Sequence, residues 1–289
     1  MIIRLALPKG SLQSSTIELF KNAGWRIVTS PRSYFPSIDD EDIECALVRA
    51  QEISRYVESG IFDIGLTGKD WILENESKVK DVADLIYSKS TSSPARWVLA
   101  VAQGSGIKRI EDLEGKKIAT ELVIFTKKYF SKLGINVDVE FSWGATEVKV
   151  ADGLVDAIVE ITETGSTIKA HNLEIIHELL VTNTKLIANN DSWKDRKKRA
   201  KIEQIALMLK SALQAEDMTG LKMNVPKDKL EDIIKILPAM TSPTVASLHN
   251  SEWYSVETIT EEKQSRDLIP KLLKIGARGI IEYPLKKVL

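Results

Sequence analysis

The sequence predicts an α/β protein with a separate C-terminal domain, and three patterns support this prediction. Short apolar runs alternate with helical patterns from the first residue, which indicates βαβ units and largely parallel sheets. One long helical pattern over residues 192–213 then interrupts the alternation. After it, residues 221–283 follow the order strand, helix, strand, strand, helix, strand, which is that of a ferredoxin-like unit. We therefore expect a domain boundary near residue 216.

Each predicted element has its own local signal. Apolar runs bounded by turn residues predict strands, apolar residues at helical spacing predict helices, and Ser11 is a candidate cap for the first helix. In the first part, strands are expected at 2–7, 43–48, 61–66, 95–101, 117–120, 137–141 and 154–161, with helices after Ser11 and at 51–59 and 123–133. In the last part, strands are expected at 221–225, 245–248, 253–259 and 278–283, with helices at 227–237 and 262–275.

Composition narrows the classes of function. The chain has 289 residues with 40 basic and 41 acidic side chains, so its near-neutral charge gives no general attraction to nucleic acid. The single Cys45 allows no intramolecular disulfide, fits a reducing compartment and lies in an apolar stretch typical of a buried residue. Apolar runs are too short to span a membrane, and the N-terminus lacks signal-peptide features. We expect a cytoplasmic protein with no nucleic-acid or membrane partner.

The most informative segment is the strand 154–161 and the turn that follows it. Thr164, Gly165, Ser166 and Thr167 form a hydroxyl-rich turn before the start of a short helix. Free backbone N–H groups at such a helix start, together with these hydroxyls, would cradle a phosphate. Glu160, at the strand's end, could then hold ribose hydroxyls, which points to a phosphoribosyl group. Taken alone, an ordinary capped turn is the better interpretation.

Cations follow three of the predicted strands. Lys9, Arg49 and Lys69 each come just after a strand's C-terminal end, which is the edge where open α/β sheets bind ligands. Any one of them is more simply a solvated surface charge, but three in the same structural position favour an anion-binding site. Arg96, at the start of a later strand, is a weaker fourth candidate.

Other motifs give no support for further chemistry. The glycines around Lys69 lack the spacing of a Walker loop, and the Gly104–Gly106 turn lacks the third glycine of a dinucleotide fingerprint. His171 and His177 are six residues apart without a nearby cysteine, which makes a zinc site unlikely. The basic run 194–201 fits a solvated helix face better than a nucleic-acid patch.

Together these residues resemble the ATP phosphoribosyltransferase family, in its long form with a C-terminal regulatory domain. The resemblance covers essentially the whole chain, and its central block is the most specific part. It rests on LALPKGSL (5–12), DIGLTGKD (63–70), GATEVKVADGLVDAIVEITETGST (144–167), SEWYSVETI (251–259) and IGARGIIEYPLKK (275–287). The sequence departs from the family's pattern in two places: Glu160 replaces a common Asp, and Ala50-Gln51-Glu52 stands where a proline-containing turn is expected.

The resemblance implies a fold like the type II periplasmic binding proteins, with two α/β lobes around a cleft. The lobes would comprise residues 1–92 with 184–215, and residues 93–183, while residues 216–289 would form a regulatory domain that binds histidine. The implied reaction transfers 5-phosphoribosyl from phosphoribosyl pyrophosphate (PRPP) to N1 of ATP and releases pyrophosphate, the first step of histidine biosynthesis. It further implies Mg²⁺ as cofactor, histidine as feedback inhibitor, and a homo-oligomer ranging from dimer to hexamer.

The resemblance also implies roles for individual residues. Glu160, Lys9 and Arg49 would be catalytic, and Asp70 would help to hold substrate or metal. The PRPP site would comprise Glu160, Thr162, Thr164, Gly165, Ser166 and Thr167. The ATP and phosphate site would comprise Lys9, Gly10, Arg49, Gly68, Lys69, Asp70 and Arg96. The effector site would comprise Thr241, Ser242, Thr244, Gly276, Ala277 and Gly279. The protein ligands of the metal, and the division of the cations between the two substrates, stay open.

Two other classes share the two-lobed architecture. A solute-binding protein would fit EDLEGKKIA (111–119), a common way for such lobes to begin a strand, but it would need a signal peptide and would lack the long tail. A ligand-sensing transcription regulator would need a helix-turn-helix module, which the βαββαβ tail is not.

Overall fold

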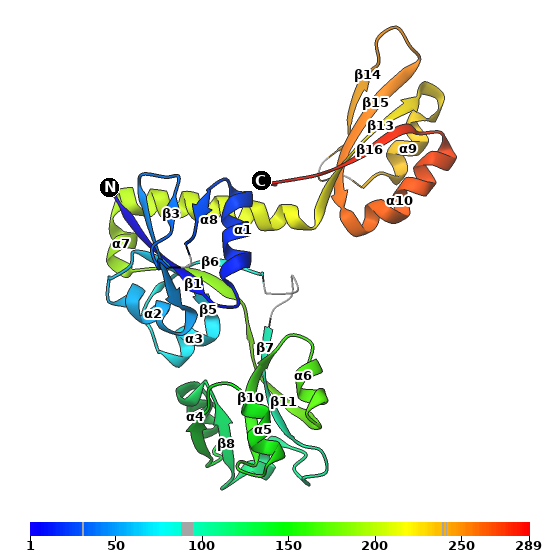
Figure 1. Cartoon of the computed structure of the whole chain (residues 1–289). Helices are drawn as coiled ribbons and strands as arrows, with labels where there is room; N and C mark the ends of the chain where they lie inside the picture. The colour runs from blue at the N-terminus through cyan, green and yellow to red at the C-terminus, as the bar shows by residue number, and fades with distance from the viewer. Residues whose placement is uncertain (31, 88–94, 239, 241) are drawn as a thin grey trace. The chain divides into compact units, whose positions relative to one another are not determined.

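The computed structural model describes residues 1–30, 32–87, 95–238, 240 and 242–289. The chain divides into two compact units. The first unit comprises Met1–Lys21 and Trp25–Ala206, and the second comprises Asn22–Gly24 and Leu207–Leu289. The first unit holds two α/β lobes and the second holds an antiparallel sheet with two helices, so the predicted fold class is confirmed (Figure 1).

The first lobe contains a five-stranded sheet in the order β4-β1-β5-β12-β6. Its apolar strands β1 and β4 run parallel in register, and β5 extends the parallel part on the other side of β1. Strand β12 is antiparallel to β5 and to β6. The elements of this lobe are β1 (Ile3–Lys9), α1 (Gln13–Ala23), β2 (Ile27–Val28), β3 (Ser37–Ile38), β4 (Ile43–Arg49), α2 (Ala50–Glu58), β5 (Ile64–Gly68), α3 (Lys69–Glu74), β6 (Lys80–Leu85), β12 (Thr184–Ala188), α7 (Asn190–Lys194) and α8 (Arg196–Glu216). The ends of α1 and α8, from Asn22 and from Leu207, belong to the second unit.

The second lobe contains a five-stranded sheet in the order β11-β7-β10-β8-β9. Strands β10, β8 and β9 are parallel, whereas β7 is antiparallel to β10 and to β11. The core around Trp97 and Leu99 is completed by side chains from β8, β10 and α4. The elements are β7 (Ala95–Ala102), β8 (Lys117–Thr120), α4 (Val123–Lys132), β9 (Asp138–Phe141), α5 (Thr146–Ala151), β10 (Ala157–Thr162), α6 (Ser166–Ala170) and β11 (Leu173–Thr182).

The C-terminal unit is a four-stranded antiparallel sheet in the order β14-β15-β13-β16. Two helices pack on one face, where Leu221, Val256 and Leu272 form the centre of the core (Figure 1). The elements are β13 (Met218–Pro226), α9 (Leu230–Ile236), β14 (Thr244–Ser247), β15 (Trp253–Glu261), α10 (Glu262–Ile275) and β16 (Arg278–Pro284). This is the predicted βαββαβ order.

Two features differ from the sequence-based expectation. The helix expected over 192–213 is two helices, because Asp195 ends α7 and its carboxylate accepts hydrogen bonds from the N–H groups of Lys197 and Lys198, which caps α8. The sheets are also less parallel than expected, because β7, β11 and β12 run against their neighbours. Within the described part of the chain, no helix is long and apolar enough to cross a membrane.

Candidate active site

A cleft of about 690 Å³ lies in the first unit, and both lobes line it. Strand ends and helix starts supply most of its wall, as expected for the C-terminal edge of parallel strands. The first lobe contributes Pro8, Lys9, Gly10, Ser11, Leu12, Arg49, Ala50, Gln51, Gly68, Asp70, Trp71, Ile86, Tyr87 and Thr184, and the second contributes Ala95, Trp97, Glu121, Ile161, Thr162, Glu163, Thr164, Ser166, Thr167 and Thr182, with Asn183 between the lobes.

Lys9 and Arg49 meet at the edge of the first lobe's sheet. They are register partners at the ends of the parallel strands β1 and β4. The ammonium group of Lys9 lies 3.9 Å from the ring centre of Tyr34, a cation–π contact that sequence reasoning did not find. Gly10 adopts a φ of +113°, and a Cβ there would lie 3.5 Å from Nη1 of Arg49. The structure therefore brings Lys9, Gly10 and Arg49 together at the cleft.

The other two predicted cations lie outside the lining of the cleft. Lys69 begins α3, and its backbone N–H donates to the carbonyl of Asn183. Arg96 forms an ion pair with Glu178 on the neighbouring strand, with 3.1 Å between Nη1 and Oε2. An anion site built from the described cleft residues would thus rest on Lys9 and Arg49.

The hydroxyl-rich turn lies on the second lobe, between β10 and α6. Four of its hydroxyl-bearing residues, Thr162, Thr164, Ser166 and Thr167, line the cleft. The Gly165 N–H donates to Oγ1 of Thr162 at 2.8 Å, and Oγ1 of Thr164 lies 3.0 Å from Oγ of Ser166. Gly165 is buried in the left-handed region with a φ of +78°, which favours glycine. The turn is therefore a compact loop with exposed hydroxyls.

Glu160 lies beside this turn but outside the cleft lining. The Glu160 carboxylate lies near Thr146 at the start of α5, whereas the next two residues, Ile161 and Thr162, line the cleft. Burial raises the pKa of Glu160 to about 7, and the nearby carboxylates Glu147 and Glu121 add to the rise. A carboxyl group with this pKa changes its charge near neutral pH.

Asp70 is a buried link between the two lobes. Its Oδ2 accepts a hydrogen bond of 2.7 Å from Nε1 of Trp97, and its Oδ1 accepts from the N–H of Trp71 at 3.0 Å. The side chain is only 3% exposed, and burial raises the pKa of the carboxyl group. A Cβ at Gly68 would overlap Oδ1 of Asp70, which explains glycine there. The assignment of Asp70 to substrate or metal stays a prediction, although both carboxylate oxygens already accept protein hydrogen bonds.

Glu74 makes a second connection between the lobes, and sequence reasoning missed it. Its two carboxylate oxygens accept hydrogen bonds from the backbone N–H groups of Ile124 and Phe125, at 3.0 and 2.8 Å. These N–H groups lie in the first turn of α4, where a carboxylate is favoured by the unpaired donors and the helix dipole. The segment that follows β8 is therefore fixed against α3. No local sequence signal indicates this contact, because 50 residues separate Glu74 from Ile124.

The predicted effector residues lie at two edges of the C-terminal sheet. Thr244 begins the edge strand β14, and Ser242 precedes it, both exposed, while Thr241 lies outside the described residues. Gly276 ends α10 and Gly279 lies in the opposite edge strand β16, with the buried Ala277 between them. Three strand spacings, about 14 Å, separate β14 from β16. One chain therefore does not bring the two groups together.

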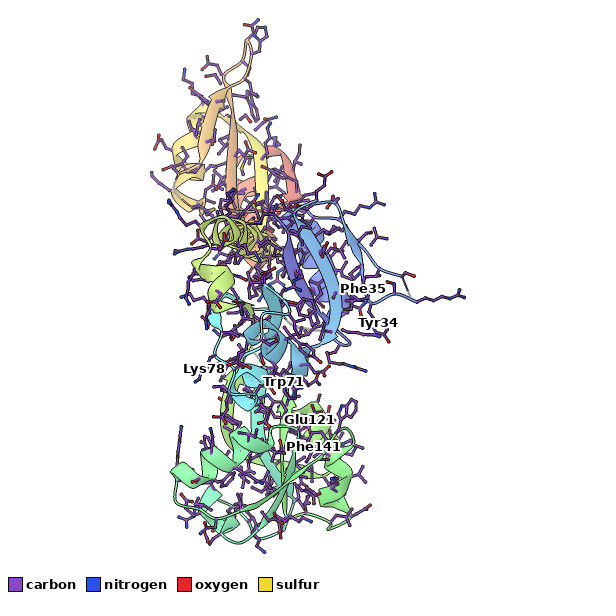
Figure 2. All side chains as sticks on the ribbon, turned by 90° about the vertical axis from the view of Figure 1, so that its left-hand side faces the viewer. Tyr34, Phe35, Trp71, Lys78, Glu121 and Phe141 are labelled. Carbon is purple, nitrogen blue, oxygen red and sulfur yellow. The ribbon has the colours of Figure 1, made fainter. Side chains whose placement is uncertain are left out.

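Among the described residues, no group of three or more His, Cys, Asp or Glu side chains is arranged to hold a metal ion. The carboxylates of the cleft differ in their availability. Asp70 is hydrogen bonded to Trp97 and is buried, whereas Glu121 is a half-buried lining residue whose label lies close to that of Trp71 in Figure 2.

This arrangement is that of a two-lobed enzyme of the type II periplasmic-binding-protein fold class, extended by a ferredoxin-like unit. Residues 49–211 match the family model of ATP phosphoribosyltransferase, and residues 215–287 match the model of the HisG C-terminal domain. The chain belongs to the ATP phosphoribosyltransferase family, in its long form. Its activity is that of an ATP phosphoribosyltransferase, a pentosyltransferase of histidine biosynthesis.

Individual relatives agree with this assignment. The chain is 60% identical over 288 residues to the ATP phosphoribosyltransferase of Desulfosudis oleivorans, covering 100% of this chain and 99% of the relative. It is 62% identical over 288 residues to that of Solidesulfovibrio magneticus, covering 100% and 98%. A solved chain from the ATP phosphoribosyl transferase (HisG:HisZ) complex of Thermotoga maritima is 30% identical, with a TM-score of 0.62, and the match covers 72% of this chain and 99% of that chain.

Proposed function

We propose that the cleft of the first unit is the place where ATP and PRPP react. The observation that supports this most strongly is that Lys9 and Arg49 from one lobe and the hydroxyl-rich turn from the other line the same cleft of about 690 Å³. Two phosphorylated substrates need such anion-binding groups on both sides of the reacting atoms. We further propose that residues 1–92 with 184–215 form one catalytic lobe, 93–183 the other, and 216–289 the regulatory domain.

The reaction joins adenine N1 to C1 of the ribose as the bond from C1 to pyrophosphate breaks. The electron pair of that bond leaves with pyrophosphate, and positive charge develops on the ribose ring, as in glycosyl transfer generally. Thr164, Ser166 and Thr167 would bind the 5′-phosphate, while Lys9 and Arg49 would neutralise departing or ATP phosphate charge. The protein's contribution is then positioning and electrostatics, with no protein nucleophile.

Mg²⁺ is proposed to enter with the substrate phosphates, since the described residues offer no cage of protein ligands. When bound, it would neutralise pyrophosphate charge and so assist departure. The cytoplasmic location stays a prediction.

Activity should depend on the ionisation of Glu160. Glu160 lies beside the turn but outside the cleft lining, so we propose that it acts through its charge: the charged carboxylate would stabilise positive charge on the ribose, and this form prevails above a pKa of about 7. We therefore expect kcat/KM for PRPP to rise as the pH increases through about 7. Glu160→Gln should lower kcat/KM about 10- to 100-fold and flatten this rise. Initial rates of pyrophosphate release from pH 5.5 to 8.5 would test this, and an unchanged profile in the variant would exclude Glu160 as its source.

Histidine is proposed to act on the C-terminal unit. The two predicted groups of effector residues lie about 14 Å apart in one chain, so a site that uses both needs a second copy of the chain. The proposed homo-oligomer, dimer or hexamer, would supply that copy.

Thr244→Arg should abolish histidine inhibition while leaving basal activity unchanged, because the new side chain would occupy the effector site. Thr244 is exposed, so the fold should tolerate the change. Ser247→Arg is the matched control, since Ser247 is exposed on the same strand but points to the opposite face. The measurement is pyrophosphate release from ATP, PRPP and Mg²⁺ with and without histidine. Equal inhibition of both variants would place the effector elsewhere, and a wild-type chain without pyrophosphate release would contradict the proposed site as a whole.

A further inference from the structure

One wall of the cleft differs chemically from the cationic edge and the hydroxyl-rich turn. It is formed by Gln51, Trp71 and Glu121, which we call the acidic wall. Gln51 and Trp71 come from the first lobe, and Glu121 directly follows β8 in the second, with its label close to that of Trp71 in Figure 2. The ring of Trp71 is held by an edge-to-face contact with Trp97, with 6.3 Å between ring centroids.

Glu121 is a half-buried carboxylate whose partner in the structure is a neutral group. Its side chain hydrogen bonds to that of Gln51 across the cleft, and no ion pair within the described residues joins it to a cation. Burial and the neighbouring Asp70 raise the pKa of its carboxyl group. A carboxylate in such surroundings is costly unless a ligand donates hydrogen bonds to it.

The backbone around Glu121 is also fixed. Thr120 is fully buried at the end of β8, and its Oγ1 accepts from the N–H of Leu122 at 3.1 Å. Ile124, three residues after Glu121, and Phe125 donate backbone hydrogen bonds to the carboxylate of Glu74, which belongs to the opposite lobe. Glu121 therefore projects from a backbone that is held on both sides, and such a residue can offer a preorganised acceptor to a bound substrate.

The substrate part that suits this wall is the purine base. Phosphates would be repelled by Glu121 and are accommodated by Lys9, Arg49 and the hydroxyl-rich turn. Adenine is neutral, is flat enough to lie against Trp71, and carries an N6 amino group that donates hydrogen bonds. We propose that Glu121 accepts a hydrogen bond from N6 of the adenine of ATP, a proposal that rests on the proposed active site.

This contact would act on the reaction as well as on binding. When N1 forms its bond to ribose C1 and pyrophosphate leaves with the electron pair, adenine gains one positive charge. That charge is shared along the amidine group N1–C6–N6, so the hydrogen bond from N6 to a carboxylate becomes stronger in the transition state than in the ground state. The same contact explains preference for a 6-aminopurine, because a nucleotide without the amino group donates no hydrogen bond to the Glu121 carboxylate.

The test compares two nucleotides with two enzymes. Purine riboside 5′-triphosphate keeps N1 and lacks the 6-amino group, and its lower intrinsic N1 reactivity affects both enzymes equally and cancels. Glu121→Ala should reduce kcat/KM for ATP about 10- to 100-fold, the range for a hydrogen bond to a charged group, but that for purine riboside 5′-triphosphate less than about threefold. Glu121→Gln, which preserves shape and an acceptor oxygen, should lie between wild type and Glu121→Ala with ATP. Equal losses with both nucleotides would overturn the proposal.

A ribose contact is the competing outcome. If Glu121→Ala instead loses its effect with 2′-deoxy-ATP, Glu121 binds a ribose hydroxyl and the adenine assignment is wrong. Glu174→Ala, which removes an exposed carboxylate of β11 in the same lobe, should leave both nucleotides unaffected. Turnover of ATP and PRPP by the wild-type enzyme distinguishes failure of the proposed active site from failure of the proposed role of Glu121. If the wild-type enzyme shows no turnover, the proposed active site is wrong. If it does, equal losses with both nucleotides contradict only the role of Glu121.

Discussion

Replacement of Arg49 by alanine should lower kcat/KM about 10²- to 10³-fold, the usual loss when one preorganised donor to a charged transition state is removed. Arg49 ends β4 beside Lys9, and its guanidinium lies at the cleft close to the backbone of Gly10. Because the side chain is exposed, the free energy of unfolding should change by only about 0.5 kcal/mol. Arg49→Lys keeps the charge but loses the planar fork, so its rate should be intermediate.

A nearby arginine provides the control for Arg49. Arg55 is exposed on α2 and pairs with Glu52 on the same helix, with 3.9 Å between Nη2 and Oε1. Arg55→Ala removes the same charge from the same region and should retain wild-type kinetics. Steady-state rates with each substrate varied in turn would show whether Arg49 serves ATP or PRPP. A loss of less than threefold in Arg49→Ala would remove this residue from the site.

The proximity of Lys9 and Arg49 was predictable from the geometry of parallel strands. Lys9 and Arg49 each follow an apolar strand, and parallel neighbours bring the residues after their C-terminal ends to one edge. The same rule placed Lys69 at this edge, where it does lie at the start of α3, but Lys69 is not among the residues that line the cleft. Position along the edge is therefore readable from sequence, whereas side-chain direction is not.

The contacts between the lobes were not predictable. Asp70 and Trp97 are 27 residues apart in the sequence, and Glu74 and Ile124 are 50 residues apart. The local sequence around these four residues does not indicate which residue each one contacts. Strand β10 shows a related limit. Its apolar run predicts a strand, but the run does not show that Ile161 and Thr162 line the cleft while Glu160 lies toward α5.

The C-terminal unit illustrates the same distinction at the level of whole elements. Its helix α10 begins and ends where the periodicity predicts, because Gly276 stops it in a backbone conformation that favours glycine. The strand order β14-β15-β13-β16 then separates Thr244 from Gly279, although the motifs that contain them were read as one effector site. Sequence adjacency to a motif does not establish proximity in the fold.

Replacement of Gly165 by valine should raise the KM for PRPP about 100-fold or more and leave the KM for ATP nearly unchanged. Gly165 adopts a φ of +78°, where a β-branched residue is strongly disfavoured, and an added Cβ would lie 3.3 Å from Cδ1 of Ile175. The turn must then change shape, which would misdirect the hydroxyls of Thr164 and Ser166 and break the hydrogen bond from Gly165 to Thr162. Gly165→Ala should have a smaller effect of the same kind.

Gly144→Val is the control for Gly165→Val, because it introduces similar backbone strain without changing the hydroxyl-rich turn. Gly144 lies in the same lobe with a φ of +71°, and a Cβ there would have no heavy atom within 4 Å. Both valine variants should therefore lose a similar amount of stability, about 1 to 3 kcal/mol, measured as the free energy of unfolding in urea. Only Gly165→Val should lose affinity for PRPP. The two variants share the conformational cost of valine at a positive φ. If the KM for PRPP rises equally in both variants, the effect is due to the stability of the lobe. If it rises in neither variant, the turn does not hold the 5′-phosphate.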